Sequence, residues 1–412
     1  MSDLEQRLAD LDDQGLRRRM RLVSGPQGPR VVLDGKGVLL LCSNNYLGLA
    51  DHERVREAAA DAAMRWGAGA GASRLVSGTM TIHRTLEARL AQFKGTEASV
   101  LFGSGYLANI GVVSALATAG GPQTVVFSDA LNHASIVDGC RLAKAQTVVY
   151  DHCDTEHLAW CLAQHEGRPG VIVTDSVFSM DGDVAPLAEI AELAQRFGAR
   201  VIVDEAHGTG CSGPGGRGAV AEAGLEGVVD VVVGTLGKAL GAYGAFAACS
   251  RTMADFLTNT SRPLIFSTAP PPPAVAGALA ALELLIEEPG RVDQLQANAD
   301  TLRDALAREG FQVAGSTTQI VPLIVGDAAL AMQICEQAIV GGVFAQAIRP
   351  PTVPEGTSRL RLAVMASHTK AELREAARVL GHAAMHAGFR PGAGLPVAAA
   401  QPGRSPRAIN AA

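Results

Sequence analysis

Short apolar runs alternate with longer helical patterns between residues 95 and 250. The runs occupy residues 98–102, 124–129, 147–152, 170–175, 200–205, 230–235 and 245–250. They are continuously apolar rather than alternating, as is typical of strands buried on both faces. The segments between them, such as residues 185–199, repeat apolar residues at i, i+3 and i+4. The pattern predicts an α/β domain built on a largely parallel sheet with helices on both sides.

A second, smaller domain is predicted after the proline-rich stretch at residues 267–277. Helical patterns follow to about residue 308, and strand-like runs at 319–327 and 359–364 then alternate with helices. This order predicts an α+β domain. We expect an N-terminal arm over residues 1–45, a large domain over 46–289, a C-terminal small domain over 290–389 and a disordered tail over 390–412, the last because it is rich in Ala, Pro and Gly without periodicity.

Polar residues follow the predicted strands at one end. Asp129, Asp151, Asp175, Asp204 and Thr235 each lie at or just beyond the carboxyl end of a run. Open parallel sheets bind their ligands at this edge. We therefore expect the chemistry of the protein here.

One lysine, Lys238, stands in the turn "GTLGKALG" among small residues. The turn is not a nucleotide-binding P-loop, because Val232 replaces the first glycine and Ala239 replaces the Ser or Thr that holds magnesium. The glycine-rich stretch at 67–73 also lacks the spacing of a dinucleotide-binding turn. A desolvated lysine is an amine nucleophile toward an aldehyde, although a lysine that only extends to water is the alternative.

Asp204 and His207, in "VIVDEAHGTG", supply the partners that such a lysine would need. Pyridoxal 5′-phosphate (PLP) requires a lysine for the Schiff base, a carboxylate at the ring nitrogen and a donor near the ring hydroxyl. Taken singly, Asp204 is as well explained as a helix N-cap and His207 as a core histidine. Together with Lys238 they favour a PLP enzyme.

Composition excludes several other classes. The chain has 412 residues, 48% of them hydrophobic, and a formal net charge of −6, so it is neither a disordered protein nor one with an overall basic field for nucleic acid or an anionic membrane. Its seven cysteines show no CxxC spacing, which predicts reduced thiols and no metal site. The N-terminus resembles neither a signal nor a transit peptide, and no apolar run approaches a membrane span. We expect a cytoplasmic protein.

With these motifs in order, the chain resembles the α-oxoamine synthases, PLP enzymes of the aspartate-aminotransferase fold (fold type I). The resemblance covers about residues 40–385 and rests on "SNNYLGL" (43–49), "GAGASRLVSGT" (69–79), "SDALNHAS" (128–135), "SVFSMDGDVAPL" (176–187), "VDEAHGTG" (203–210), "GRG" (216–218), "GTLGKALG" (234–241) and "RLRL" (359–362). It implies a large domain with a mostly parallel sheet, a smaller C-terminal α+β domain, PLP as cofactor and acyltransferase activity.

Within this family the chain looks most like the members that join L-alanine to a pimeloyl thioester of CoA or of the acyl-carrier protein (ACP), with loss of CO2. The likeness is greatest at "PLIVGD" (322–327) and "AIRPPTVPEGTSRLRL" (347–362). Condensation of glycine with acetyl-CoA, or use of another acyl-CoA, is the alternative. A non-catalytic subunit of the same fold would be expected to lack Lys238.

The resemblance also implies roles for the residues around the cofactor. Lys238 would hold PLP as a Schiff base and then act as the base, and Asp204 would pair with the ring nitrogen. His207 and Ser179 would lie near the ring hydroxyl, and His133 would stack on the ring and meet the acyl substrate. Without the likeness, His133 reads as a core or cap residue.

The cofactor phosphate would be bound by three segments. Gly105 and Tyr106 follow a predicted strand and open a helix, so their amides would face an anion, and Thr235 would add a hydroxyl. An ordinary tight turn also explains this glycine-rich stretch. Family likeness places Thr268, or Ser267, at the phosphate of a second subunit, which implies a homodimer with its active site at the interface.

Substrate groups would be met by residues at both ends of the chain. Arg361 looks like the family arginine that binds the amino-acid carboxylate with two hydrogen bonds, assisted by Asn45. Thr352 would lie near the acyl thioester, and Arg17, in "RRRMR", near its acyl or CoA part. A solvent-facing strand position explains Arg361 as well, and a solvated helix end explains Arg17.

Overall fold

The computed structural model describes residues 2–313 and 315–390, and the chain divides into two compact units. The larger unit contains residues 49–179 and 183–293, and the smaller contains residues 2–48, 180–182 and those from 294 onward. The N-terminal residues, expected as a separate arm, thus lie in the same unit as the C-terminal residues. The tail expected over 390–412 lies outside the described residues except for Arg390.

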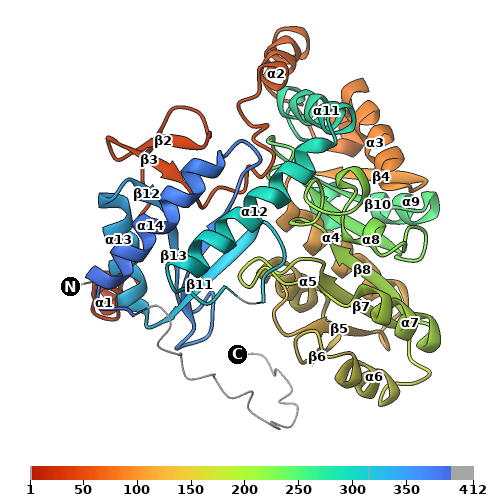
Figure 1. Ribbon diagram of the computed structural model, residues 1–412. Helices are drawn as coiled ribbons and strands as arrows, with labels where there is room; N and C mark the ends of the chain where they lie inside the picture. Colours follow the sequence, from red (N-terminus) through yellow and green to blue (C-terminus); the bar gives the residue numbers. More distant parts are fainter. Residues whose placement is uncertain (1, 314, 391–412) are drawn as a thin grey trace. The chain divides into compact units, whose positions relative to one another are not determined.

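The larger unit is built on a seven-stranded sheet (Figure 1). The strand order is β4-β10-β9-β8-β7-β5-β6, and β10 alone runs antiparallel to both of its neighbours. The strands are β4 (Ala98–Phe102), β5 (Val125–Asp129), β6 (Gln146–Tyr150), β7 (Gly170–Asp175), β8 (Arg200–Asp204), β9 (Val231–Thr235) and β10 (Ala245–Cys249). Each of the seven predicted runs forms a strand, so the prediction of a largely parallel sheet is confirmed.

Helices cover this sheet. Those of ten residues or more are α2 (Glu53–Trp66), α3 (Thr81–Lys94), α4 (Gly105–Ala119), α5 (Ala134–Ala143), α7 (Leu187–Phe197), α9 (Arg251–Thr260) and α11 (Pro272–Glu287). Shorter ones are α6 (Thr155–Ala163), α8 (Ala219–Glu222) and α10 (Arg262–Ile265). Apolar residues of α4 and α5 pack with the strand valines into one buried cluster. In α7 the buried residues recur at the predicted helical spacing, from Leu187 through Ile190 to Ala194.

The smaller unit combines two short sheets with four helices. Strands β11 (Ile320–Gly326), β14 (Ser358–Ala363) and β13 (Gln346–Ile348) form an antiparallel sheet, in that order. Strands β1 (Val23–Ser24), β2 (Arg30–Leu33), β3 (Lys36–Leu40) and β12 (Val343–Phe344) form the other. The helices are α1 (Asp3–Asp13), α12 (Gly290–Arg308), α13 (Ala328–Val340) and α14 (Lys370–His386), with α12 beginning at the unit boundary. The predicted α+β character of this part is confirmed.

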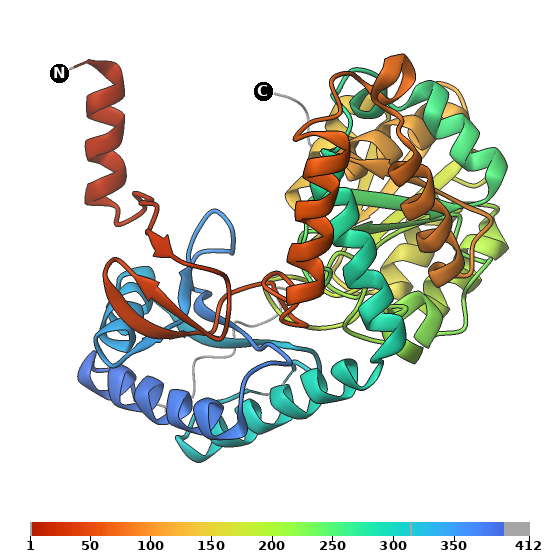
Figure 2. The same ribbon diagram turned by 90° about the horizontal axis from the view of Figure 1, so that it is seen from above.

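The pairing of β3 with β12 holds the N-terminal residues to the C-terminal part of the chain. Leu39 and Leu40 pair in parallel with Val343 and Phe344. Helix α1 is the exception in this unit, because none of its residues is buried and it projects from the rest of the unit (Figure 2).

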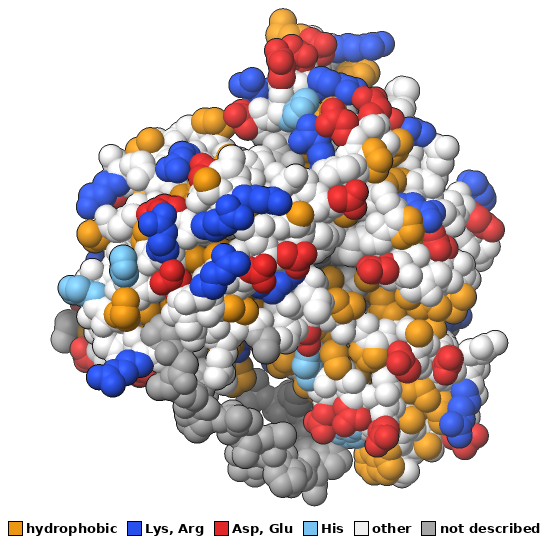
Figure 3. Space-filling model, in the orientation of Figure 1, with side chains coloured by type: hydrophobic (Ala, Val, Ile, Leu, Met, Phe, Trp, Pro, Cys, Tyr) orange, Lys and Arg blue, Asp and Glu red, His pale blue; other side chains and the backbone are white. Residues whose placement is uncertain are grey.

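The visible face carries basic and acidic side chains interspersed rather than in one-sign fields (Figure 3). This distribution fits the small negative net charge. Within the part of the chain that the structure describes, no helix has both the length and the apolar character needed to cross a bilayer.

Candidate functional site

Three neighbouring strands of the larger unit end in the polar side chains that the sequence singled out. Asp175 ends β7, Asp204 ends β8 and Thr235 ends β9. The parallel register sets Asp175 directly beside Asp204. The polar edge predicted from the sequence is therefore formed by the carboxyl ends of these strands.

Lys238 and His207 meet above this edge. The Lys238 Nζ atom lies 2.7 Å from His207 Nε2, and the histidine is 5% exposed. The lysine turn needs a glycine at its end, since Gly241 has a φ of +59° and a Cβ there would overlap the backbone of Ala50. The turn after β8 and the turn after β9 thus bring the predicted lysine and imidazole into hydrogen-bonding distance.

The Asp204 carboxylate is buried and held by two donors. The side-chain amide of Asn109, on α4, donates to Oδ2 at 2.5 Å, and the backbone N–H of Ala206 donates to Oδ1 at 2.7 Å. Asp204 is 3% exposed. Each carboxylate oxygen of Asp204 therefore accepts one hydrogen bond, and the two bonds fix the orientation of the side chain.

His133 is the N-cap of α5 and is held by neighbours on both sides. Its backbone N–H donates to Asp175 Oδ2 at 2.7 Å, and its Nδ1 lies 2.7 Å from Ser135 Oγ. Burial lowers the pKa of His133 and the charge of Lys238 lowers it further, while Asp204 opposes them. The charges of Lys238 and Asp204 therefore both act on His133.

Asp175 was noted in the sequence only as a polar residue at a strand end. Its carboxyl is 5% exposed, and burial together with the charge of Asp204 raises its pKa well above the usual range. It holds the backbone of His133 and stands beside Asp204. Its position makes it part of the support of the site.

The phosphate-binding residues predicted for one subunit lie on adjacent segments. Helix α4 begins at Gly105, and a Cβ at this glycine would lie 3.8 Å from Thr235 Cβ, so the two segments are adjacent. The ring of Tyr106 stands edge-on to that of His133, with centroids 6.5 Å apart. Thr268, which was predicted to reach the phosphate of a second subunit, pairs with Ser73 in an isolated bridge.

Ser179 lies in the loop that follows β7. Its side chain is half-buried, at the end of the larger unit's first segment. Its predicted place near the ring hydroxyl of the cofactor remains a prediction.

In the smaller unit, Arg361 is buried and held by two residues of the segment "SNNYLGL". Its guanidinium donates to Asn44 Oδ1 and to Tyr46 Oη, each at 3.2 Å. The intervening Asn45 donates its side-chain amide to Gln27 O at 2.8 Å. Arg361 sits on β14 but is 6% exposed, so the alternative of a solvent-facing strand position is excluded.

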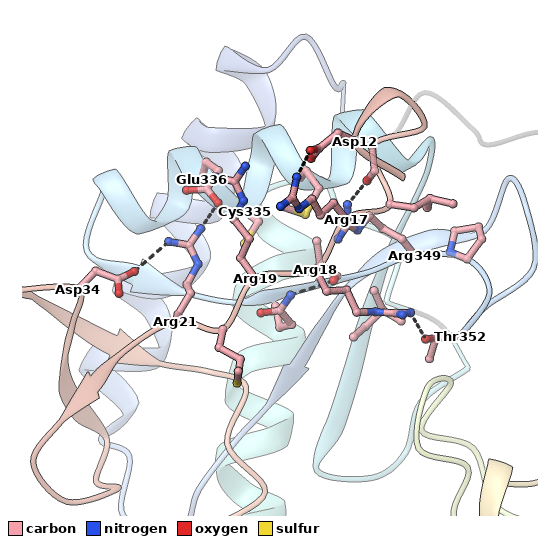
Figure 4. A pocket seen from close by; sticks show the side chains of 18 residues that line it. Asp12, Arg17, Arg18, Arg19, Arg21, Asp34, Cys335, Glu336, Arg349 and Thr352 are labelled. Atoms are coloured by element: carbon pink, nitrogen blue, oxygen red, sulfur yellow. Dashed lines mark hydrogen bonds and ion pairs between the residues drawn. The ribbon is translucent and has the colours of Figure 1, made fainter. Parts of the chain in front are cut away.

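Arg17 and Thr352, predicted to meet the acyl substrate, line one cavity of about 860 Å³ in the smaller unit (Figure 4). Arg17 is paired with Asp12, and the guanidinium of Arg18 lies 3.5 Å from Thr352 Oγ1. Burial lowers the pKa of Arg349, and the like charge of Arg18 lowers it further. The excess of arginines over acids makes this cavity a place for an anion.

Several residues in these arrangements were not predicted from the sequence. Asn109, Ser135, Asn44 and Tyr46 each bond to a predicted residue. Asn109 stands four residues, about one helical turn, after Gly105, and Asn44 and Tyr46 flank Asn45. Their distance along the sequence from predicted residues could have indicated them, but this distance does not show which side chain bonds to which partner.

A second cluster in the larger unit brings together Asp129, His152 and Cys153, whose possible metal-ligating atoms lie within 4.8 Å of one another. The His152 ring is hydrogen bonded at 2.9 Å to Asp129 Oδ1 and at 2.7 Å to Asp183 Oδ2. The backbone N–H of Cys153 occupies the other Asp129 oxygen at 2.8 Å. These bonds assign the cluster a structural role between two loops.

Comparison with known proteins gives close relatives. The chain is 52% identical over 374 residues to an 8-amino-7-oxononanoate synthase of Geobacter metallireducens, covering 90% of this chain and 95% of the relative. It is 53% identical over 366 residues to one of Anaeromyxobacter dehalogenans, covering 89% and 91%. Among solved structures, an SPT (serine palmitoyltransferase) with a PLP internal aldimine matches with a TM-score of 0.89 at 32% identity, covering 94% of this chain and 98% of the other.

The groups of the larger unit fit PLP. An amine, a buried carboxylate and two imidazoles lie together, and the first turn of α4 stands next to Thr235. A phosphate is favoured at a helix N-terminus, where amide N–H groups are unpaired. The donor set therefore has one group for each part of the cofactor, and PLP is the cofactor of this protein.

A family model also covers most of the chain. The model of the aminotransferase class I and II family matches residues 36–380. The sheet, the lysine turn and the relatives agree with this match. The chain belongs to the aminotransferase class I and II family, and within it to the PLP-dependent α-oxoamine synthases of fold type I.

Proposed function

We propose that this protein condenses L-alanine with a pimeloyl thioester and releases 8-amino-7-oxononanoate, CO2 and the free thiol, the 8-amino-7-oxononanoate synthase step of biotin biosynthesis. The observation that carries the proposal is the 52–53% identity to synthases of that name over about nine-tenths of the chain. The meeting of Lys238, His207, Asp204 and His133 supports it, because the site has the groups that the reaction requires.

PLP supplies an electron sink for the electron pairs left on the α-carbon of the amino acid, first on proton loss and later on loss of CO2. Lys238 would bind the cofactor through its amine and move the α-proton. His207, whose Nε2 atom lies 2.7 Å from Nζ, would hold the amine between these tasks. Asp204, whose two oxygens each accept one hydrogen bond, would pair with the ring nitrogen.

The substrate groups are assigned to the remaining residues. Arg361, fixed by Asn44 and Tyr46, would bind the carboxylate of alanine. Thr352 and Arg17, in their cavity, would bind the acyl thioester. His133 would cover the ring face and meet the acyl group from the larger unit. The α-carbon then bonds to the thioester carbonyl carbon as the thiol leaves, the former alanine carboxylate departs as CO2, and the α-carbon takes up a proton in its place.

Substrate choice can be tested by steady-state assays of thiol and CO2 release. Alanine, glycine and serine are each combined with pimeloyl, acetyl and palmitoyl thioesters, the last because of the likeness to SPT. We expect the highest kcat/KM for alanine with a pimeloyl thioester. A higher value for glycine with acetyl-CoA would overturn the substrate assignment while leaving the cofactor assignment intact.

A lysine pair tests the role of Lys238. Lys238→Ala should lose the visible absorbance of bound PLP and reduce kcat by about 10⁴-fold or more. Lys370→Ala, at the exposed start of α14, should retain both. Full activity of the Lys238→Ala protein would refute the proposal.

We also propose a homodimer in which Thr268 reaches the cofactor phosphate of the partner, and a cytoplasmic location. Helix α1 has no buried residue, which supports a second subunit that covers it. Fractionation of cells would test the location.

Mixing Lys238→Ala with Thr268→Ala protein tests whether the site is shared between subunits, because one site in a mixed dimer would have both native residues. We expect this mixture to regain PLP binding at up to half of the mixed-dimer sites; no gain over the separate variants would contradict it.

A further inference from the structure

A series of buried hydrogen bonds joins Asp204, assigned to the ring nitrogen of the cofactor, to His133, assigned to the face of the ring. It runs from Asp204 through the side chain of Asn109 and the hydroxyl of Ser135 to His133. All three links measure between 2.5 and 2.9 Å. Asn109 is 1% exposed and Ser135 is fully buried, so water does not compete for these bonds.

The hydrogen bonds in the middle of this series can have only one donor-to-acceptor direction. The Asn109 amide nitrogen has two hydrogens and no acceptor, and it uses one toward Asp204 Oδ2 and the other toward Ser135 Oγ. A flipped amide would set its oxygen against the Asp204 carboxylate, so the flip is disfavoured. Asp204 must therefore accept, and Ser135 Oγ must accept from Asn109.

The same direction continues to His133. Since Ser135 Oγ already accepts from Asn109, its own hydrogen is available for His133 Nδ1 at 2.7 Å. The backbone N–H of Ser135 points to the same nitrogen at 3.3 Å. His133 Nδ1 is therefore an acceptor, and its ring hydrogen is on Nε2. The lowered pKa of His133, caused first by burial, agrees with a neutral ring.

We propose that Asn109 is a positioning residue that fixes Asp204 as an acceptor and His133 as the neutral tautomer with its hydrogen on Nε2. Asn109 touches neither substrate nor cofactor in this assignment, and it acts through the two residues at the ends of the series. The inference rests on the proposed roles of Asp204 and Lys238 toward PLP.

Of the groups around His133 and Asp204, Asn109 is the one that sets the direction of these hydrogen bonds. Among the described residues, the charged or titratable groups near His133 and Asp204 are Asp175 on β7, Lys238 after β9 with its neighbour His207, Tyr106 on α4 and, farther off, Asp129 on β5. Asp175 binds the backbone of His133, not its ring. No group of the described residues donates to the buried Asn109 Oδ1 atom, so an amide stands here despite an unsatisfied acceptor.

Asn109→Asp tests the inference because it keeps the shape and replaces the donor by a carboxyl group. Two facing carboxyls would share a proton, so Asp204 would lose part of its charge. We expect the dissociation constant of PLP, measured by fluorescence of the apo-protein, to rise about tenfold or more. We also expect the midpoint of the pH titration of the visible cofactor absorbance to shift by about one pH unit.

A matched control separates positioning from stability. Asn298 is a fully buried asparagine of the smaller unit whose amide donates to the carbonyls of Met365 and His368. Asn298→Asp should lower the melting temperature without moving the titration midpoint. If Asn109→Asp does only the same, Asn109 has a purely structural role and the inference is wrong.

A second variant applies if Asn109→Asp does not fold. Ser135→Ala breaks the link to His133 and leaves the Asn109–Asp204 bond in place. It should shift the titration midpoint while the PLP dissociation constant stays within about threefold. An unchanged titration midpoint would show that Asn109 does not act on His133 through Ser135, and the inference would be wrong. Failure of the native protein to show a Lys238-dependent absorbance would instead overturn the proposed function itself.

Discussion

At the residue scale, burial and hydrogen bonding set what each carboxyl of the strand edge can do. Asp204 has a donor on each oxygen, whereas Asp175, one strand away, meets the charge of Asp204 and the backbone N–H of His133. Two buried carboxyls in register do not both retain their charge at low cost. The neutral form is therefore favoured at Asp175.

This assignment predicts that Asp175→Asn is mild and Asp175→Ala is not. The asparagine keeps an oxygen for the His133 N–H and is uncharged, like the protonated carboxyl that it replaces. The alanine leaves that buried N–H without its acceptor, which should cost about 1–3 kcal/mol. Urea denaturation of both variants measures the difference. Equal losses in the two variants would contradict a neutral Asp175.

His152 provides a pH test of stability. Burial lowers the pKa of this histidine, but hydrogen bonds to Asp129 and Asp183 outweigh burial and raise it to about 12. The folded state thus holds the proton more tightly than the unfolded chain, whose histidine titrates near 6.5. The resulting stability is complete below that value and is lost progressively as the pH rises toward 12.

We therefore expect the free energy of unfolding to fall more steeply with pH in the native protein than in His152→Gln. Between about pH 7 and 9 the two slopes should differ by up to about 1.4 kcal/mol per pH unit. Denaturant titrations at several pH values measure this, and groups common to both proteins cancel. Parallel curves would show that His152 is not charged between its two carboxylates.

At the element scale, the turn that carries Asp204 and His207 is anchored by a buried ion pair. Lys94, the last residue of α3, pairs with Glu205, and their side chains are 3% and 0% exposed. Glu205 also accepts from the backbone N–H of Val220 at 2.7 Å. The segment "GRG" runs over this carboxylate, since a Cβ at Gly218 would overlap it. The glycine motif is thus explained by close packing.

Gly218→Ala should therefore destabilise the protein by about 2–4 kcal/mol. The backbone of Gly218, with φ +103° and ψ +177°, is open almost only to glycine and costs about 1–3 kcal/mol for alanine, and displacement of the Glu205 carboxylate adds to this cost. Gly224→Ala is the matched control, because its φ is +67° and no atom lies within 4 Å of the added Cβ. Thermal or urea unfolding compares them. Losses of equal size would exclude the contact with Glu205 as the cause.

At the scale of the whole molecule, the residues assigned to PLP all lie in the larger unit. A ligand that binds only the folded state adds about 2.7 kcal/mol of stability at one hundred times its dissociation constant. Addition of PLP to the apo-protein should slow hydrogen exchange in peptides that cover residues 104–110, 200–210 and 231–241. Protection confined to the smaller unit would contradict the site. Lys370→Ala should give the native pattern, and Lys238→Ala a weaker one.

Much of the fold could be read from the chain because its signals are local. The strand β8, for example, is a continuous apolar run that ends in a carboxylate, and α7 repeats buried residues at helical spacing. The pairing of β3 with β12 carries no such signal, because two leucines meet a Val-Phe pair about 300 residues away. The domain limits expected from composition could not include this pairing.

The site divides in the same way. The sequence by itself determined the chemical groups, since Lys238, Asp204 and His207 follow strands whose carboxyl ends must meet at one edge of a parallel sheet. It also placed Arg361 and Arg17 through their resemblance to a family. Only the tertiary structure decided that Asn109 holds Asp204 and that Asn44 and Tyr46 hold Arg361. The physical reason is that periodicity fixes which face of an element is buried, whereas a buried hydrogen bond depends on atoms of distant segments brought within about 3 Å.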